Sequence, residues 1–261
     1  MILLLDLGNT NLYCGVYREN KLLCEYRTHS DPNKSSDEYK KILKDFIHAN
    51  DVHEADIKGA VLSSVVPTLG RTVKIAVEKL LNIECLMVGK NLKSGLAIHI
   101  DNPNELGSDL VSVSVGAKVR YGYPTIICDF GTATKILVID KAGAFAGCII
   151  APGIKISMKA LSNSAAQLME TSLIAPDSVI GKNSNDSINS GIIYGTIEMV
   201  EGLVKKIENE LNYKFKKVIT GGNSLLIKDH ISSEYTYDSN LIMEGLYQIY
   251  LKNRKEDDKN E

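Results

Sequence analysis

The stretch CDFGTATK, residues 128–135, lies between two runs of aliphatic and β-branched residues. The stretch LDLGNTNL, residues 5–12, has an aspartate, a glycine and a threonine in the same order, and Asp6 precedes Asp129 by 123 residues. In both copies the aspartate stands near the end of an apolar run typical of a buried strand, and a second strand-like run follows. The repetition predicts two α/β halves built on one plan.

The order of the expected strands and helices supports this duplication. In the first half we expect strands at 2–7, 12–18, 22–30, 57–66 and 84–88, and helices at 35–50 and 67–81. In the second half we expect strands at 124–130, 133–140, 144–151 and 216–222, and helices after 153, at 186–211 and at 240–253. Two serines before an Asp-Glu pair, and Pro67, are typical helix starts. The charged tail at 253–261 is predicted to be disordered.

The composition of the chain bears on whether it binds nucleic acid or membrane and on the compartment in which it folds. The 261 residues are 44% hydrophobic, enough for a full core, and no stretch has the length of a membrane span. Lys and Arg number 30 against 32 Asp and Glu, so no basic excess favours nucleic acid. The N-terminus lacks a basic leader, and we expect no signal peptide. We expect buried free thiols in a reducing cytoplasm at the five cysteines, which are Cys14, Cys24, Cys85, Cys128 and Cys148.

The repeated turn is suited to binding phosphate. Gly8 and Gly131 let the backbone turn sharply and let a ligand approach closely. The threonines and neighbouring amides can donate hydrogen bonds to phosphate oxygens, and each aspartate can hold a cation or its water shell. A single copy fits an ordinary hairpin turn as well, since Asp, Asn, Gly and Thr are common in turns. Two copies favour phosphate binding, with two loops gripping one nucleoside triphosphate.

Two loops of this kind resemble those of the acetate kinase, sugar kinase, Hsc70 and actin superfamily. Eight motifs follow the order found in type III pantothenate kinases: DLGNTN, LSSVVP, DNPNELGSD, DFGTAT, GCIIAPGI, IGKNS, SGIIYG and ITGG. The resemblance implies an α/β fold of two ribonuclease H-like (actin-like ATPase) domains, 1–115 and 116–252, with a central nucleotide cleft. It also implies a homodimer that phosphorylates pantothenate to 4'-phosphopantothenate, the first step of coenzyme A biosynthesis. The implied cofactors are ATP with Mg²⁺ and a monovalent cation, K⁺ or NH₄⁺.

The resemblance assigns roles to particular residues. Asp109 matches the catalytic base; it precedes an apolar helical pattern, and a helix dipole favours an ionised carboxylate in the first turn. The alternative is that Asp109 only caps this helix. Asp129 matches the aspartate that binds the monovalent cation, and Asp6 lies near the divalent metal. The implied ATP-binding residues are Asp6, Leu7, Gly8, Asn9, Thr10, Asn11, Leu12, Tyr13 and Thr132, and the implied substrate-binding residues are Ile100, Gly107, Ser108, Asp109, Leu110 and Ser184.

The chain departs from the family pattern around the expected acceptor pocket. Leu110 replaces a common arginine, Ile100 a common tyrosine, and Ser184 stands where threonine is usual. Lys135 replaces a common second threonine, and we expect its side chain to point to solvent rather than to reach a phosphate. These changes keep two alternatives open: a related kinase with an altered small-molecule acceptor, and a non-catalytic regulator on the same fold.

Two groups of glycines are further candidates. Gly191, Gly195 and Gly202 share roughly one face of the predicted long helix, where each costs about 1 kcal/mol relative to alanine. We expect close contact there, at a dimer interface or a domain seam. Gly221 and Gly222 end a predicted strand and could form a plain strand-to-helix turn, although in the superfamily such a pair typically lies near the nucleoside.

Overall fold

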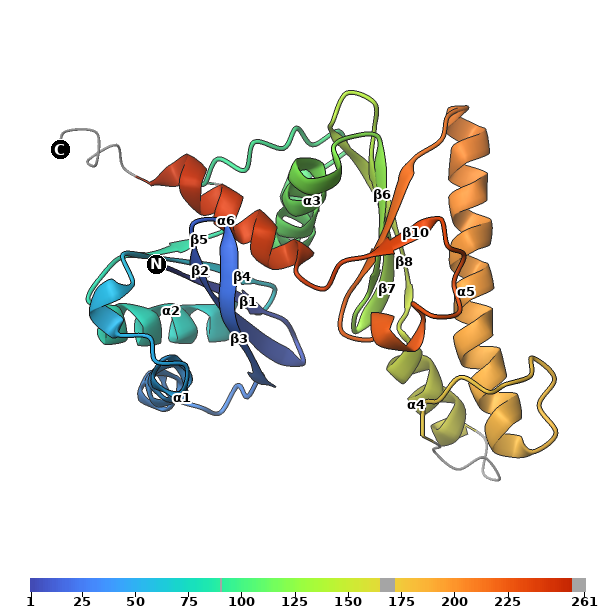
Figure 1. The fold of residues 1–261 in the computed structure, drawn as a ribbon, viewed down its shortest axis with the longest axis horizontal. Helices are drawn as coiled ribbons and strands as arrows, with labels where there is room; N and C mark the ends of the chain where they lie inside the picture. Colours follow the sequence, from blue (N-terminus) through green and yellow to red (C-terminus); the bar gives the residue numbers. More distant parts are fainter. Residues whose placement is uncertain (90, 165–171, 255–261) are drawn as a thin grey trace. The chain divides into compact units, whose positions relative to one another are not determined.

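Each copy of the Asp-Gly-Thr stretch joins the first two strands of a five-stranded sheet. The computed structural model describes residues 1–89, 91–164 and 172–254 (Figure 1). The chain divides into two compact units. Unit 1 comprises Met1–Ala97, Asp101–Arg120 and the chain from Asn240 onward; unit 2 comprises Ile98–Ile100 and Tyr121–Ser239.

The sheet of unit 1 has the strand order β3-β2-β1-β4-β5. Its strands are β1 (Ile2–Leu7), β2 (Asn11–Arg18), β3 (Lys21–His29), β4 (Gly59–Ser64) and β5 (Cys85–Met87). β1 pairs antiparallel with β2 and parallel with β4. β1 is therefore central, which explains its apolar sequence.

The sheet of unit 2 repeats this topology. Its order is β10-β9-β6-β7-β8, with β6 (Thr125–Phe130), β7 (Ala133–Ile139), β8 (Phe145–Pro152), β9 (Lys216–Thr220) and β10 (Tyr235–Tyr237). β6 pairs antiparallel with β7 and parallel with β9, as β1 does with β2 and β4. The predicted duplication is confirmed, although the sequence analysis did not predict the three-residue strand β10.

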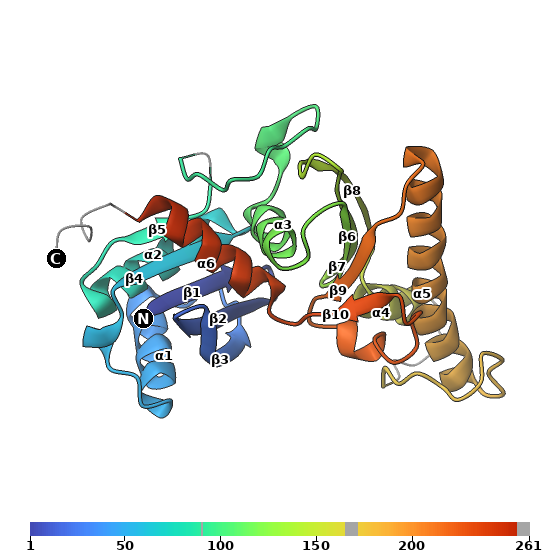
Figure 2. The same cartoon turned by 45° about the horizontal axis from the view of Figure 1, so that its top comes forward.

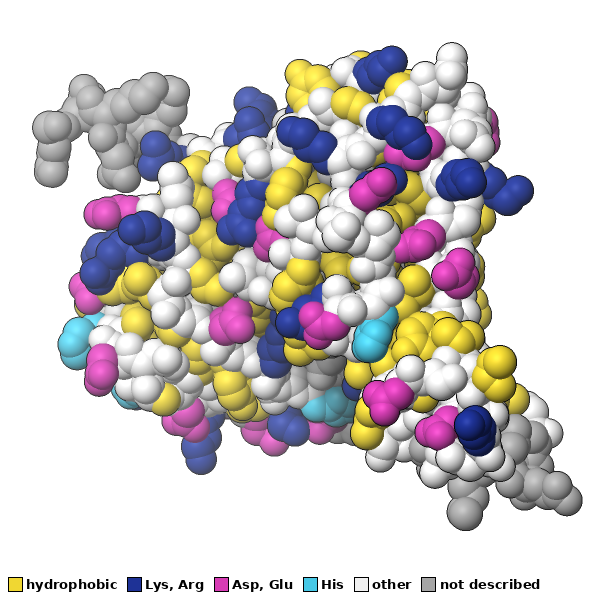
Figure 3. Space-filling model, turned by 45° about the vertical axis from the view of Figure 1, so that its right-hand side comes forward, with side chains coloured by type: hydrophobic (Ala, Val, Ile, Leu, Met, Phe, Trp, Pro, Cys, Tyr) yellow, Lys and Arg dark blue, Asp and Glu magenta, His cyan; other side chains and the backbone are white. Residues whose placement is uncertain are grey.

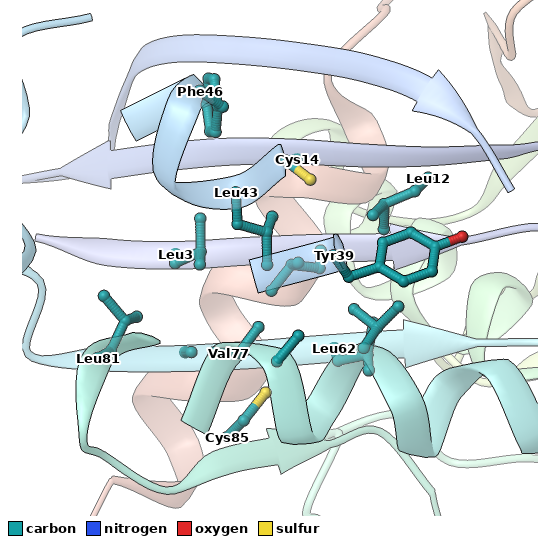
Figure 4. Packing of buried hydrophobic residues seen from close by; sticks show 14 of the residues in the cluster. Leu3, Leu12, Cys14, Tyr39, Leu43, Phe46, Leu62, Val77, Leu81 and Cys85 are labelled. Atoms are coloured by element: carbon teal, nitrogen blue, oxygen red, sulfur yellow. The ribbon is translucent and has the colours of Figure 1, made fainter. Parts of the chain in front are cut away.

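Two helices cover one face of the first sheet. α1 (Ser36–Ala49) begins with a capping box formed by Ser35 and Glu38, and α2 (Pro67–Leu81) begins at its proline, as the sequence predicts. Leu3 of β1, Leu43 of α1 and Val77 of α2 share one fully buried cluster (Figure 4). A short 3₁₀ helix, η1 (Glu54–Asp56), precedes β4.

The opposite face of this sheet is covered by α6 (Leu241–Asn253), drawn in red in Figure 2. α6 crosses α3 (Ser108–Tyr121), and the two backbones touch at a pair of glycines. A Cβ atom on Gly116 would lie 2.0 Å from the Leu241 carbonyl oxygen, and one on Gly245 would lie 1.7 Å from the Ser112 carbonyl oxygen. Only glycine fits at this crossing. The 3₁₀ helix η2 (Pro103–Glu105) leads into α3.

Unit 2 covers one face of its sheet with α4 (Ile154–Ser164) and α5 (Ser184–Leu211). α5 is the long helix that the sequence predicts, and Asn183 caps it by accepting a hydrogen bond from the Asp186 amide at 2.9 Å. Ile126 and Cys128 of β6 face these helices. The next residue, Asp129, therefore belongs to the other face. The 3₁₀ helix η3 (Ser224–Leu226) follows β9.

The thiol prediction is wrong at one position. Cys14, Cys85 and Cys128 are buried, and burial raises the pKa of each thiol. Cys24 is half-buried and Cys148 is exposed, because β8 is an edge strand whose alternate residues face solvent. No disulfide joins any of the five cysteines, all of which lie in the described part of the chain.

The predicted tail at 253–261 lies almost wholly outside the described residues, since α6 ends at Asn253 and residues 255–261 are not described. The domain division at 115 and 116 stays a prediction; by their contacts, α3 up to Arg120 and α6 belong to unit 1. Among the described residues, no helix combines the length and apolar character needed to cross a membrane. Acidic and basic side chains are interspersed on the face drawn in Figure 3.

Gly245→Ala should lower the free energy of unfolding by at least about 1–3 kcal/mol, because the added methyl group meets backbone rather than a side chain that could turn away. Urea unfolding followed by circular dichroism measures the change. Val119→Ala, at a position of α3 that is 52% exposed, is the control and should shift stability by less than about 0.5 kcal/mol. Equal stability of Gly245→Ala and wild type would contradict the contact.

Candidate active site

The turn after β1 forms a closed loop that presents polar side chains. The Gly8 amide donates to the Asn11 carbonyl oxygen at 2.9 Å. Ser30 fixes the loop from the end of β3: its hydroxyl donates to the Gly8 carbonyl at 2.8 Å and its amide to the Thr10 carbonyl at 2.9 Å. Asn9, Thr10 and Asn11 are exposed. The loop therefore offers amides and polar side chains to a ligand while its backbone is held in place.

Three residues of the predicted ATP loop face inward. Leu7 and Leu12 are fully buried in the core beneath α1 and α2, and Tyr13 is 5% exposed on the α6 side. The Tyr13 hydroxyl donates to Glu25 Oε2 at 2.5 Å, and burial raises the pKa of Tyr13. These side chains shape the loop, so any contact with ATP would come from their backbone.

Asp6 stands one residue before the end of β1, half-buried. It pairs in register with Tyr13 of β2 and Ser63 of β4. Because side chains alternate along a strand, Asp6 lies on the face that α6 covers, together with Leu4. Its carboxylate is thus placed at the edge of the sheet where the glycine loop turns.

Ser108 attaches the start of α3 to this edge. Its Oγ lies 3.1 Å from Ser63 Oγ, accepts a hydrogen bond from the Ser64 amide at 3.0 Å and donates to the Ser64 carbonyl at 3.0 Å. Asp109 follows in the first turn of α3, as predicted. Asp6 is thus connected to the start of α3 in two steps. Asp6 pairs in register with Ser63, and Ser63 contacts Ser108, the residue before Asp109.

Gly107 makes room for the Asp109 carboxylate. A Cβ atom on Gly107 would lie 2.5 Å from Asp109 Oδ1. The carboxylate thus folds back over the glycine at the N-terminal end of the helix. Leu110, in contrast, is buried, with 7% of its surface exposed. Asp109 is the only charged residue in the predicted segment 107–110, at the start of α3.

The second loop is tighter. Gly131 and Thr132 alone join β6 to β7, and the Gly131 amide donates to the Ala133 carbonyl at 3.1 Å. Asn223 fixes this turn, since its amide donates to the Phe130 carbonyl and its side-chain amide to the Gly131 carbonyl, both at 2.9 Å. Thr132, the predicted ATP contact, is exposed. Both loops thus share the exposed polar tip and the backbone support.

Lys135 does not point to solvent, which corrects the expectation from the sequence. It stands directly opposite Asp129 in the β6–β7 register, and its Nζ lies 3.0 Å from Asp129 Oδ2. The two side chains are only 15% and 17% exposed, respectively. The register of the hairpin fixes this pairing: Phe130 stands opposite Thr134, so Asp129 stands opposite Lys135.

Gly221 closes the other side of the Asp129 carboxylate. A Cβ atom on Gly221 would lie 2.4 Å from Asp129 Oδ1, and the residue has a φ of +95°, which L side chains rarely adopt. Gly221 is therefore required by the second loop itself. Its predicted position near the nucleoside stays a prediction.

The two aspartates differ in how they could hold cations. Within the described ranges no group of three His, Cys, Asp or Glu side chains could hold a metal. Mg²⁺ in kinases commonly uses one or two carboxylates together with substrate phosphates, and the single carboxylate of Asp6 beside the glycine loop fits this role. Asp129 does not fit an exchangeable cation in the same way, because the Lys135 ammonium already lies against Oδ2.

The remaining substrate candidates lie in unit 2. Ile100 is half-buried at the end of a segment in which the His99 amide donates to the Phe145 carbonyl at 2.8 Å. Ser184 is exposed in the first turn of α5. It lines a hollow of about 720 Å³ whose walls include Leu161, Lys182, Ser187 and Ile192. This hollow is large enough for a small molecule.

The sequence analysis missed three residues of these loops and assigned the wrong orientation to a fourth, Lys135. Ser30 and Asn223 hold the turns, Ser63 accompanies Ser108, and Lys135 pairs with Asp129. Ser63 and Lys135 could have been found by writing out the strand register of the two repeats, which places them beside Asp6 and opposite Asp129. Ser30 and Asn223 are fixed by tertiary contacts that no local pattern indicates.

Comparison with known proteins agrees with this geometry. The family model of the type III pantothenate kinases matches residues 2–206. A type III pantothenate kinase of Listeria innocua is 39% identical over 254 residues, covering 97% of this chain and 98% of the relative. In the following structural comparisons, the fold is similar but sequence identity is low.

A Campylobacter jejuni protein assigned to the Baf family of transcriptional activators aligns with a TM-score of 0.61 and 18% identity, covering 96% of this chain and 98% of its own. MreB 5 of Spiroplasma citri aligns with a TM-score of 0.53 and 12% identity, covering 95% of each chain. The fold is thus the two-lobed α/β fold of actin-like ATPases and sugar kinases. With its ordered motifs, its duplicated loops and this relative matching almost end to end, the chain belongs to the type III pantothenate kinase family.

Proposed function

We propose that this protein transfers the γ-phosphoryl group of ATP to the primary hydroxyl of pantothenate, giving 4'-phosphopantothenate, the first step of coenzyme A biosynthesis. The observation that carries the proposal is family membership over nearly the whole chain. A carboxylate at the start of α3, attached to the strand edge that bears the first phosphate loop, fits this chemistry. Phosphoryl transfer needs positioning, charge neutralisation and an oriented hydroxyl more than covalent participation of the protein.

Asp109 is the general base of the proposed reaction. It accepts the proton of the pantothenate hydroxyl as the oxygen attacks the γ-phosphorus and the bond to the β-phosphate oxygen breaks, leaving ADP. The Ser108 hydrogen bonds fix the first turn of α3, and Gly107 lets the carboxylate lie over the helix start. A charged carboxylate is stabilised there by the helix dipole.

The first loop binds the phosphates. Backbone amides and the exposed side chains of Asn9, Thr10 and Asn11 donate hydrogen bonds to phosphate oxygens, and Asp6 holds the divalent metal or its water shell. Mg²⁺, when bound, neutralises charge on the phosphates. Thr132 contacts ATP from the second loop.

Of the acceptor residues that the resemblance implies, Gly107, Ser108 and Asp109 belong to unit 1, and Ile100 and Ser184 belong to unit 2. Leu110 acts by packing rather than by contact with a charged group, since it is buried. The resemblance also implies K⁺ or NH₄⁺ at Asp129. Because Lys135 already supplies a positive charge there, no step of this mechanism depends on that ion.

The enzyme works as a homodimer in this proposal. Gly191, Gly195 and Gly202 are exposed on α5, and an added Cβ at each would meet no described atom within 4 Å apart from its chain neighbours and the adjacent backbone of its own helix. Nothing within the described chain therefore offsets the cost of three helix-interior glycines. A second copy packed closely on this face would offset it. A cytoplasmic location stays a prediction, which the absence of disulfides among the five cysteines supports.

Asp109→Asn should lower kcat by about 10²- to 10⁴-fold, because the amide cannot accept the hydroxyl proton. ADP release with ATP and Mg²⁺, with and without pantothenate, measures the change, and calorimetry should give an unchanged affinity for ATP. Asp45→Asn, an exposed carboxylate of α1, is the matched control and should keep full activity. Wild-type protein that releases no ADP in response to pantothenate would overturn the function, and full activity of Asp109→Asn would overturn the role of the base.

Gly195→Leu should give a folded monomer. The leucine has open space within its own chain, so thermal stability of the subunit should be kept, while close approach of a second copy is blocked. Analytical ultracentrifugation measures the mass, and Lys41→Leu, at an exposed position of α1, is the control that should leave the dimer intact. A Gly195→Leu protein that remains dimeric and active would place the dimer interface elsewhere.

A further inference from the structure

The second phosphate loop contains an ion pair at a cross-strand position where the first loop has a tyrosine. Asp129 and Lys135 face each other across β6 and β7, with Nζ 3.0 Å from Oδ2. At the corresponding place in the first loop, Asp6 stands opposite Tyr13, whose hydroxyl is directed to Glu25. The residue opposite the aspartate is therefore a neutral tyrosine in the first sheet and a cationic lysine in the second.

The surroundings of Asp129 require a positive charge. The side chain is 17% exposed, and backbone and glycine positions crowd its Oδ1: an added Cβ on Gly221 would lie 2.4 Å away and one on Gly131 3.4 Å away. A largely buried carboxylate without a counter-charge is strongly destabilised. Asp129 therefore needs a cation on its Oδ2 side, whichever cation this is.

Lys135 can supply this cation permanently. Its ammonium is a compact unit charge with three hydrogen-bond donors, and it is carried by a strand that is paired on both sides. An alkali or ammonium ion would have to displace Nζ from Oδ2 to take the same place. The threonine expected at this position from the resemblance carries no charge and leaves the carboxylate to be neutralised by an ion from solution.

We infer that the Lys135 ammonium is a built-in substitute for the monovalent cation of the second phosphate loop, so that this kinase binds ATP without K⁺ or NH₄⁺. The inference rests on the proposed function, since it concerns the ATP site of the same reaction. Lys135 is a positioning residue here: it acts on the nucleotide through Asp129 and the loop of Gly131 and Thr132. The competing reading is an ion pair that only stabilises the sheet.

The test compares wild type with Lys135→Thr in chlorides of tetramethylammonium, Na⁺, K⁺ and NH₄⁺ at equal ionic strength. Calorimetry gives the dissociation constant of ATP with Mg²⁺, and pantothenate-dependent ADP release gives turnover. The wild-type constant should vary by less than about twofold, because no cation site is coupled to the nucleotide site. Lys135→Thr should bind ATP about 5- to 150-fold more tightly in K⁺ or NH₄⁺ than in tetramethylammonium, the range typical of coupled sites.

Lys217→Thr is the matched control. Lys217 lies in the same sheet, its side chain is 11% exposed, and it forms ion pairs with Glu208 and Glu234. Its loss should lower the melting temperature without creating a dependence on the cation. If Lys135→Thr is merely less stable, with a cation profile as flat as that of Lys217→Thr, the ion pair is structural only and the inference is wrong.

A measurement of the cation itself keeps the inference separate from the proposed function. Crystals of wild type and of Lys135→Thr are soaked in thallous acetate, because Tl⁺ replaces K⁺ and scatters anomalously. We expect an anomalous peak at Asp129 in Lys135→Thr and none in wild type.

A peak at Asp129 in wild type, or wild-type turnover that requires K⁺, overturns the inference while the kinase assignment stands. Wild type that binds no ATP in any salt overturns the proposed function, and the thallium peaks then decide the occupant of Asp129. If Lys135→Thr does not fold, the wild-type salt profile and soak decide it alone.

Discussion

The backbone contact between α3 and α6 is the constraint on which the proposed catalytic residue depends. α6 lies on the first sheet through Leu246 and Met243, and α3 reaches α6 closely enough that only Gly116 and Gly245 fit between them. With α3 held at this crossing, its first residue meets the end of β4 and forms three polar contacts through Ser108 Oγ. The direction of Asp109 is thus decided by packing about two helical turns away, because a rigid helix transmits a position along its length.

Duplication gives the two loops one topology, and small differences in loop length give them different chemistry. Three residues separate β1 from β2, whereas two separate β6 from β7. In both sheets the aspartate has a serine or threonine beside it on the parallel neighbour, Ser63 for Asp6 and Thr220 for Asp129. The antiparallel neighbour differs, with Tyr13 in one and Lys135 in the other. The two sheets thus share a frame and differ at one cross-strand position beside the aspartate.

Much of this architecture could be predicted from the sequence because its signals are local. The capping box at Ser35 and Glu38 and the proline at residue 67 fix helix starts within a residue or so, and the repeated Asp-Gly-Thr stretch indicated the repeated sheets. Features that depend on strand register or on tertiary contacts were not predicted. The orientation of Lys135 follows from its cross-strand partner, and β10 gains its identity only from pairing with β9. Ser30 and Asn223 act on loops far away in the chain, which no window of sequence contains.

A charge fixed in the fold and a charge that exchanges with solvent serve a phosphate site differently. An exchangeable ion must be recruited and ordered, and its occupancy follows its concentration. An ammonium on a strand is already oriented, so it costs no reorganisation when the nucleotide binds. Its cost is instead carried by the folded state, since two charged groups are held with 15% and 17% exposure. Gly131 and Gly221 make this arrangement possible by removing the side chains that would otherwise separate the carboxylate from its loop. The second loop thus carries the counter-charge of its aspartate in its own sequence.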